Sequence, residues 1–173
     1  MRLGLAVCLA LAPGLAAAQD AGGWPLHGHD LGGQRYSPLA TVDTGSVARL
    51  QPAWTWRSGV TATFQATPIV LDTVMYLSLP FSGVAALDAR TGREFWRYTH
   101  TSRTETLCCG PANRGVAVAA GKVYVGTTDG RLLALDAATG AVRWDVTVAE
   151  YGGTTESTGE LAAGDPMSRV GKT

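Results

Sequence analysis

The sequence predicts an all-β fold made of four-stranded antiparallel blades, an incomplete portion of a β-propeller. Apolar residues of the 173-residue chain occur in short runs broken by Gly, Asp and Thr rather than at helical spacing. Two segments match closely, "ALDARTGREFW" (86–96) and "ALDAATGAVRW" (134–144), so residue 86 repeats at residue 134 with an offset of 48. A repeat of this length is typical of propellers and solenoids.

The first residues resemble a cleaved secretory signal. A basic start at residues 1–2 precedes an apolar run from Leu3 to Leu15, and small residues lead to an expected cut after Ala18. The apolar run is shorter than the roughly 20 residues that a membrane-spanning helix needs. We therefore expect a signal peptide at 1–18, no membrane span once it is removed, and a location in the bacterial periplasm.

The next segments predict a lead-in to the blades. "WPLHGHDLGGQRYSPL" (24–39) reads as a loop, and "RLQPAWTW" (49–56) as a single strand that would complete another blade. After Val148 no β-branched run follows, which indicates an irregular tail at 149–173. The expected organisation is thus a partial propeller at 19–148, with the lead-in and two blades, followed by this tail.

Each repeat resolves into four short strands. In the first repeat these are "PIVL" (68–71), "VMYLSL" (74–79), "VAAL" (84–87) and "EFWRY" (94–98). In the second they are "VAVA" (116–119), "VYVGT" (123–127), "LLAL" (132–135) and "VRWDV" (142–146). Asp129–Gly130 is a two-residue hairpin signal. Trp96 and Trp144 fall on the outer strands, where we expect each ring to pack against a neighbouring blade.

The turn before each outer strand begins with an aspartate and ends with a glycine. Asp88 and Asp136 open the turns "DARTG" and "DAATG", and their side chains are expected to accept hydrogen bonds from the turn backbone. Gly92 and Gly140 close the turns, where a positive φ is expected.

The cysteines are few and adjacent. Cys8 leaves with the predicted signal, so Cys108 and Cys109 remain in a compartment where disulfides persist. Adjacent Cα atoms lie about 3.8 Å apart, below the roughly 4.4–6.8 Å that disulfides prefer, so a bond between them would be strained and rigid. Free thiols and zinc ligation are the alternatives to a vicinal disulfide, the interpretation we favour. Zinc would need two further ligands, and the chain offers only three histidines, none at a customary spacing: His27, His29 and His100.

Arg114 follows the cysteines, and the repeat indicates where it lies in the fold. The offset of 48 aligns two segments at the start of the first strands, "FQATPIV" (64–70) and "ANRGVAV" (112–118). First strands line the central channel of a propeller, so Gln65, Arg114 and the cysteine loop should converge at one end of the channel. The planar fork of Arg114 suits carboxylate or quinone oxygens. The alternative is a surface salt bridge with Glu105 or Asp129.

From Trp24 to about Val148 the chain resembles the N-terminal part of the pyrroloquinoline quinone (PQQ)-dependent alcohol dehydrogenases, the methanol and ethanol dehydrogenase family of eight-bladed propellers. The resemblance lies in "RYSPL", "LQPAWTW", "FQATPIV", "VMYLSLP", "CCGPANRG" and both "A-x-D-A-x-T-G-x-x-x-W" segments, which are similar to the family's tryptophan docking motif.

The resemblance implies a set of cofactor-binding residues. Cys108 and Cys109 would form a vicinal disulfide stacked on the quinone, and Arg114 would contact the polar edge of the cofactor. Gln65 stands where many members have a glutamate that meets the cofactor, and Thr158 matches a cofactor-binding threonine. The family's calcium or lanthanide ligands and its aspartate base have no counterpart in this sequence, which therefore does not decide whether the chain is itself an enzyme.

These observations predict an N-terminal fragment of a periplasmic quinoprotein dehydrogenase that oxidises a small alcohol with PQQ and is inactive alone, with a periplasmic cytochrome c as electron acceptor. The alternatives are a non-catalytic PQQ-like propeller scaffold of the cell envelope, and a chain that assembles with a separately encoded remainder. The 14 basic and 14 acidic residues balance, so nothing indicates a nucleic acid partner.

Overall fold

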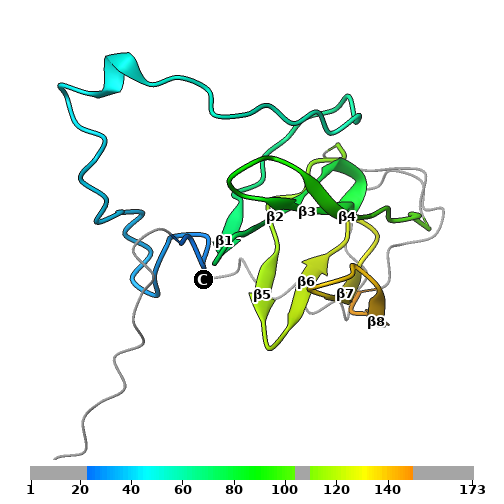
Figure 1. Cartoon of the computed structure of the whole chain (residues 1–173). Coiled ribbons are helices and arrows are strands. Elements are labelled where there is room, and N and C mark those ends of the chain that lie inside the picture. The colour runs from blue at the N-terminus through cyan, green and yellow to red at the C-terminus, as the bar shows by residue number, and fades with distance from the viewer. Residues whose placement is uncertain (1–22, 104–109, 150–173) are drawn as a thin grey trace, which may run out of the picture.

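The computed structural model describes residues 23–103 and 110–149, which contain two four-stranded antiparallel sheets (Figure 1). The first sheet runs in the order β1 (Ile69–Leu71), β2 (Val74–Ser78), β3 (Val84–Asp88) and β4 (Glu94–Tyr98). The second runs in the order β5 (Ala117–Ala119), β6 (Lys122–Gly126), β7 (Arg131–Asp136) and β8 (Val142–Thr147). Strands adjacent in sequence are adjacent in each sheet, as in a propeller blade. The predicted strands are confirmed to within one residue at either end.

Helical structure is minor in the part of the chain that the structure describes. It comprises two 3-10 helices, η1 (Val47–Arg49) and η2 (Pro80–Ser82). None of the helices described there is long and apolar enough to cross a membrane.

The two sheets repeat each other in register. Tyr76 of β2 pairs with Ala86 of β3, and Tyr124 of β6 pairs with Ala134 of β7. The pairing with the outer strand shifts after Ala86 in the first sheet and after Ala134 in the second. The offset of 48 residues therefore extends from the sequence to the position of the β-bulge.

The turns before the outer strands form as predicted. Oδ1 of Asp88 accepts hydrogen bonds from the backbone N–H groups two and three residues later, at 2.9 and 3.1 Å. Oδ1 of Asp136 accepts the equivalent bonds at 3.0 and 2.9 Å. Gly92 and Gly140 have φ values of +71° and +74°. Because a side-chain carboxylate satisfies the turn backbone, both blades reverse direction with the same local geometry.

The turn between β6 and β7 has four residues, 127–130, the length that the predicted strands leave between them. The two-residue hairpin that Asp129–Gly130 indicates does not form. The N–H of Thr127 donates to the carbonyl of Arg131 at 2.8 Å, and the hydroxyl of Thr127 accepts from the N–H of Arg131 at 3.0 Å. These two bonds close the turn, with Gly130 at φ +75°.

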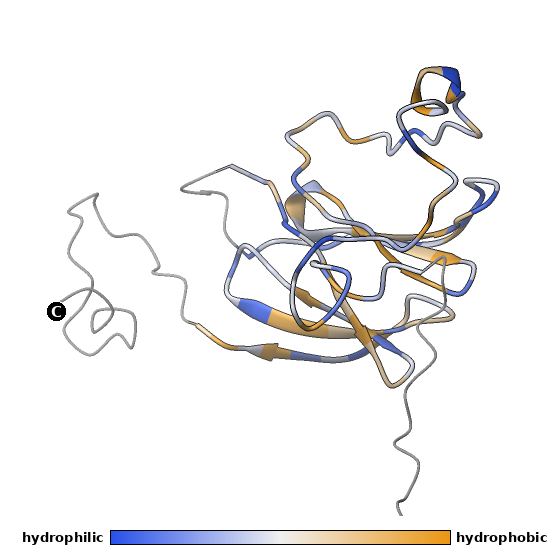
Figure 2. Ribbon diagram, turned by 90° about the vertical axis from the view of Figure 1, so that its left-hand side faces the viewer, coloured by the Kyte–Doolittle hydropathy of each residue, from blue (hydrophilic) through white to orange (hydrophobic). Residues whose placement is uncertain are grey.

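The main hydrophobic core lies between the two sheets. Its buried members come from both blades: Tyr76, Val84, Ala86, Val123, Val125, Leu133 and Leu135. Figure 2 shows hydrophobic segments along the strands of both sheets. A second, smaller cluster, Leu79, Ala85 and Leu87, packs against Trp54 and Trp56 of the lead-in. The first blade is therefore enclosed between the second blade and the lead-in.

The prediction of a single strand at 49–56 is wrong, because the structure contains no strand there. A strand needs a neighbouring strand to pair its backbone groups, and this segment attaches through side chains instead. Nε1 of Trp54 donates to the carbonyl of Ala89 at 3.1 Å, and Nε1 of Trp56 donates to Oε2 of Glu94 at 3.0 Å.

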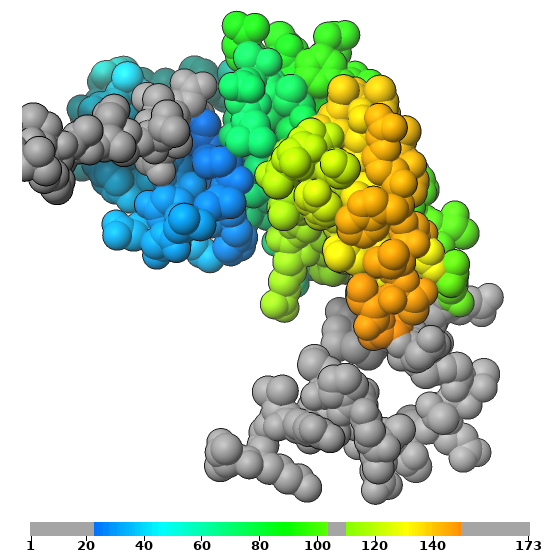
Figure 3. All heavy atoms as spheres, turned by 90° about the horizontal axis from the view of Figure 1, so that it is seen from below, coloured from blue at the N-terminus to red at the C-terminus, as the bar shows by residue number. Residues whose placement is uncertain are grey.

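The beginning of the lead-in also contacts the first blade. Trp24 exchanges two backbone hydrogen bonds with Val70 of β1, at 2.8 and 2.9 Å. Figure 3 shows this part of the lead-in, in blue, against the first sheet, in green. The contact brings His27 close to the start of both blades, where the site described next is found.

Candidate functional site

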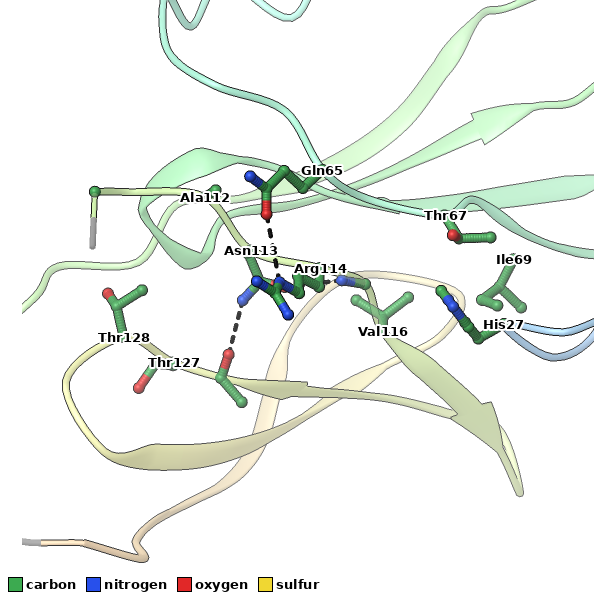
Figure 4. Close-up of a pocket in the computed structure, with 13 residues that line it drawn as sticks. His27, Gln65, Thr67, Ile69, Ala112, Asn113, Arg114, Val116, Thr127 and Thr128 are labelled. Carbon is green, nitrogen blue, oxygen red and sulfur yellow. Dashed lines mark hydrogen bonds between the residues drawn. The ribbon is translucent and has the colours of Figure 1, made fainter. Parts of the chain in front are cut away.

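A hollow of about 690 Å³ lies where the first strands of the two blades begin (Figure 4). Its lining comes from four parts of the chain that are distant in sequence: His27, and residues within 65–69, 110–116 and 126–128. The volume falls within the roughly 300–1,000 Å³ of ordinary ligand pockets. The 48-residue repeat creates the hollow, because it places equivalent ends of β1 and β5 side by side.

Gln65 and Arg114 meet at this hollow. Nε of Arg114 donates to Oε1 of Gln65 at 3.3 Å, and both side chains are exposed (Figure 4). The structure thus brings together the two candidate residues that it describes. Nε uses one donor of the guanidinium, and the four N–H groups of its two terminal nitrogens have no acceptor within the described part of the chain, so they can serve a ligand.

The salt-bridge alternative for Arg114 fails for Asp129. Oδ1 of Asp129 lies 2.9 Å from Nε2 of His100, and Oδ2 accepts the backbone N–H of Arg103 at 2.9 Å. Asp129 is therefore engaged at both oxygens away from Arg114. The other proposed partner, Glu105, lies outside the described residues.

The remaining candidate residues, Cys108, Cys109 and Thr158, lie outside the described residues, so their roles stay predictions. The chain next to the cysteines is described. Gly110 lines the hollow, and the carbonyl of Pro111 accepts the N–H of Phe81 at 2.8 Å. The chain that follows Cys109 is thus held against the first blade at the wall of the hollow.

Sequence reasoning missed Asn113, which has a specific place in the site. Its Nδ2 donates to the carbonyl of Gly126 at 2.8 Å, and its Oδ1 accepts the N–H of Gly115 at 3.1 Å. The signal that could have found it is the repeat, because the offset of 48 aligns Asn113 with Gln65. Amide side chains therefore stand at the same position in both blades.

A buried hydrogen-bonded cluster lies beside the hollow. The side chains of His100 and Asp129 are 4% and 1% exposed, and Asp129 also accepts a hydrogen bond from the hydroxyl of Thr127. Burial raises the pKa of Asp129, but hydrogen bonds from Thr127, from the backbone of Arg103 and from His100 outweigh burial and lower this pKa to about 2. The cluster ties the end of β4 to the turn at 127–130.

Metal-binding clusters are absent from residues 23–103 and 110–149, where no three His, Cys, Asp or Glu side chains could hold an ion together.

Residues 24–155 match the model of the family described as PQQ glucose/ethanol/alcohol dehydrogenase, beta-propeller domain. The chain belongs to this family. The predictions of the PQQ alcohol dehydrogenase family and of an all-β propeller fold are therefore confirmed.

Two curated PQQ-family relatives are similar over most of the chain. The quinohemoprotein alcohol dehydrogenase ADH-IIG of Pseudomonas putida is 47% identical over 135 residues, which are 76% of this chain and 19% of the relative. The 1-butanol dehydrogenase (cytochrome c) of Thauera butanivorans is 44% identical over 146 residues, 83% of this chain and 21% of the relative. The chain spans about a fifth of the length of these relatives.

Solved structures agree with this assignment. The P. putida ADH-IIG structure superposes with a TM-score of 0.72 at 47% identity, and the match covers 75% of this chain and 19% of that one. A europium-containing methanol dehydrogenase superposes with a TM-score of 0.71 at 33% identity, and the match covers 76% of this chain and 24% of that one.

Proposed function

We propose that this chain forms one side of a PQQ-binding pocket in a periplasmic quinoprotein alcohol dehydrogenase. The observation that carries the proposal is the meeting of Arg114 and Gln65 at a hollow between two blades of a PQQ-family propeller. PQQ is a planar anion with carboxylate and quinone oxygens, which are the acceptors that a guanidinium fork binds best. The donor set of the hollow therefore fits this cofactor.

The proposed roles of the residues follow from their contacts. Arg114 binds the anionic edge of PQQ, and Gln65 orients the guanidinium by accepting its Nε hydrogen. A disulfide between Cys108 and Cys109 would supply a rigid face for the ring, and Thr158 a further hydrogen bond. When bound, PQQ supplies the two-electron oxidant for alcohol oxidation.

The names of the relatives support the substrate and partner. One is a quinohemoprotein alcohol dehydrogenase and the other a 1-butanol dehydrogenase paired with cytochrome c. We propose a small alcohol as substrate and a cytochrome c as electron acceptor of the complete enzyme. The signal-like segment at 1–18 supports a periplasmic location.

We also propose that the 173-residue chain alone does not oxidise alcohols. Alcohol oxidation in this family combines the quinone with a Lewis acid and a base, and the sequence has no counterpart of the family's metal ligands or aspartate base. Dye-linked alcohol oxidation by the purified chain with PQQ and calcium would contradict this proposal.

The pocket is tested in a chimera. Residues 24–148 replace the corresponding segment of P. putida ADH-IIG, and PQQ binding is measured by absorbance titration. Arg114→Ala should weaken PQQ binding by about 10-fold to 100-fold, the usual loss for a charged hydrogen bond. The matched control is Arg90→Ala, an exposed arginine on the turn of the first blade, which should bind like the parent.

Two outcomes would favour a non-catalytic scaffold instead. One is a chimera that folds, as judged by circular dichroism, yet does not bind PQQ. The other is equal PQQ affinity of the parent and Arg114→Ala.

A further inference from the structure

We infer that Asn113 is a positioning residue for Arg114. Among the described residues its side-chain amide hydrogen-bonds only backbone groups, and through them it affects the strength of PQQ binding. The inference rests on the proposed function for its link to PQQ. Its geometric part, the fixing of Arg114, stands on the contacts of Asn113 alone. Asn113 lies at the wall of the hollow, directly before Arg114 in the chain.

The amide of Asn113 bridges two parts of the second blade. Nδ2 donates to the carbonyl of Gly126, the last residue of β6, at 2.8 Å, and Oδ1 accepts the N–H of Gly115 at 3.1 Å (Figure 4). A carbonyl can only accept and an N–H can only donate, so these partners fix which end of the amide points where. A carboxylate of the same shape would lack the donor toward Gly126.

The backbone of Asn113 is tied to the first blade. Its carbonyl accepts a hydrogen bond from Oγ of Ser78 at 3.3 Å. Ser78 ends β2 and is completely buried. One residue is thus held by the end of β2 in the first blade and by the end of β6 in the second, which fixes it at the junction of the two blades.

Arg114 lies between two residues that Asn113 holds in place. Asn113 precedes it, and Gly115, with φ +146°, follows it. Among the described residues the guanidinium makes one hydrogen bond, at 3.3 Å, to the exposed Gln65. Because this bond is long and both partners are exposed, Gln65 orients the guanidinium only weakly, and the position of the backbone at Arg114 sets where the side chain can reach. Ordering a free arginine on binding would cost affinity, and a pre-set backbone reduces that cost.

The geometric part is tested on the 173-residue chain by NMR of arginine Nε–H groups. Arg114→Lys identifies the Arg114 signal. We expect the order parameter of this group to fall in Asn113→Ala and to keep the parent value in Gln51→Ala, a matched removal of an exposed amide on the lead-in. An unchanged Arg114 signal in Asn113→Ala would overturn the inference, whether or not the chain binds PQQ.

The binding part uses PQQ titrations of the same substitutions in the chimera at pH 7.5 and pH 4.5, each relative to the parent chimera. Asn113→Ala should bind about 3-fold to 10-fold more weakly at both pH values, because the backbone around Arg114 loses both hydrogen bonds of the amide. Asn113→Asp should bind at least about 10-fold more weakly at pH 7.5, because a carboxylate would face the carbonyl of Gly126 without a hydrogen between them. At pH 4.5 about a fifth of a carboxyl with the ordinary pKa of about 3.9 is protonated and regains that donor, so affinity should recover by about twofold to threefold and remain below that of the parent.

The outcomes separate the two proposals. Equal PQQ affinity of parent and Arg114→Ala, or no binding by the parent, counts against the proposed function while the NMR result still decides the role of Asn113. Parent-like affinity of Asn113→Asp at both pH values, or an equal loss in Asn113→Asp and Asn113→Ala with no recovery at pH 4.5, overturns the positioning role. If Asn113→Ala does not fold, the PQQ affinity of Asn113→Asp at pH 4.5 relative to pH 7.5 still tests the inference, because both measurements use the same variant.

Discussion

The two blades share a sequence repeat and a strand register, yet their outer strands differ in burial. In β4, partly buried residues alternate with exposed ones, whereas all six residues of β8 are exposed. Trp96 of β4 donates from Nε1 to the carbonyl of Ala137 in the second blade at 3.0 Å. Trp144 of β8 is 36% exposed and lies near Tyr124 of its own blade. The burial of an outer strand is therefore supplied by the next repeat and not by the strand's own sequence.

The lead-in packs on the first blade in the same way as the first blade packs on the second, through a tryptophan. Nε1 of Trp54 donates to the carbonyl of Ala89 at 3.1 Å, in the same way as Trp96 does to Ala137. Each ring covers the glycine of the turn, Gly92 for Trp54 and Gly140 for Trp96. These glycines provide space for a tryptophan as well as a positive φ.

The largest expected effect comes from removing the equivalent tryptophans. Trp96→Ala should destabilise the chain by about 3–5 kcal/mol, because it opens a cavity between the blades. Trp144→Ala should cost about 1 kcal/mol, because its ring is partly exposed and lacks a covering blade in the described part of the chain. Urea unfolding of the two variants measures the difference. Equal losses would contradict the conclusion that the next blade supplies the burial of the outer-strand tryptophan.

The turn glycines give the next largest effect. A Cβ on Gly140 would lie 2.5 Å from Cε3 of Trp96, while a Cβ on Gly121, at φ +69°, would meet no atom within 4 Å. Gly121→Ala should therefore cost about 1 kcal/mol for the backbone conformation alone. Gly140→Ala should cost about 2 kcal/mol more, because the tryptophan must move. Urea midpoints measure both, and a similar loss in the two variants would contradict docking of Trp96 on this turn.

Acid sensitivity should belong to the second blade, since the offset of 48 places Phe81 in the first blade where the second has Asp129. Asp129 has a folded-state pKa of about 2, below its unfolded value of about 3.9. A lowered pKa stabilises the fold above pH 4, and this stabilisation is lost as the pH falls from about 4 to 2. Asp129→Asn should remove up to about 2 kcal/mol at pH 7 and flatten the acid dependence of unfolding. An unchanged acid slope would contradict the assigned hydrogen bonds.

The smallest effect concerns the two turn aspartates. The pKa of Asp136 is lowered to about 2, first by the hydrogen bond from Arg143 and then by Thr139. The pKa of Asp88 is lowered mainly by the backbone N–H of Arg90. Arg143→Ala should raise the pKa of Asp136 and leave that of Asp88 in place, as measured by carboxyl ¹³C NMR titration. A parallel rise at both aspartates would show that the blades are electrostatically coupled.

The sequence predicted the strands, the turns and the meeting of Gln65 with Arg114, because these depend on local chemistry and on the repeat. The strand expected at 49–56 was wrong, because strand formation depends on a partner that the local pattern does not reveal. Asn113 was missed because its partner on β6 is the backbone carbonyl of Gly126, a group that every residue carries. The link between His100 and Asp129 was missed for a related reason: it joins the end of one blade to a turn of the next, and the two residues are 29 positions apart.

The turns of both blades are already filled from within the chain, by Trp54 and by Trp96. The exposed Trp144 of a second molecule could therefore pack on neither of these turns unless the lead-in first dissociated from the first blade. A head-to-tail contact that does not close into a ring can grow into a filament. The lead-in blocks such growth, because it occupies the turn that the next molecule would need.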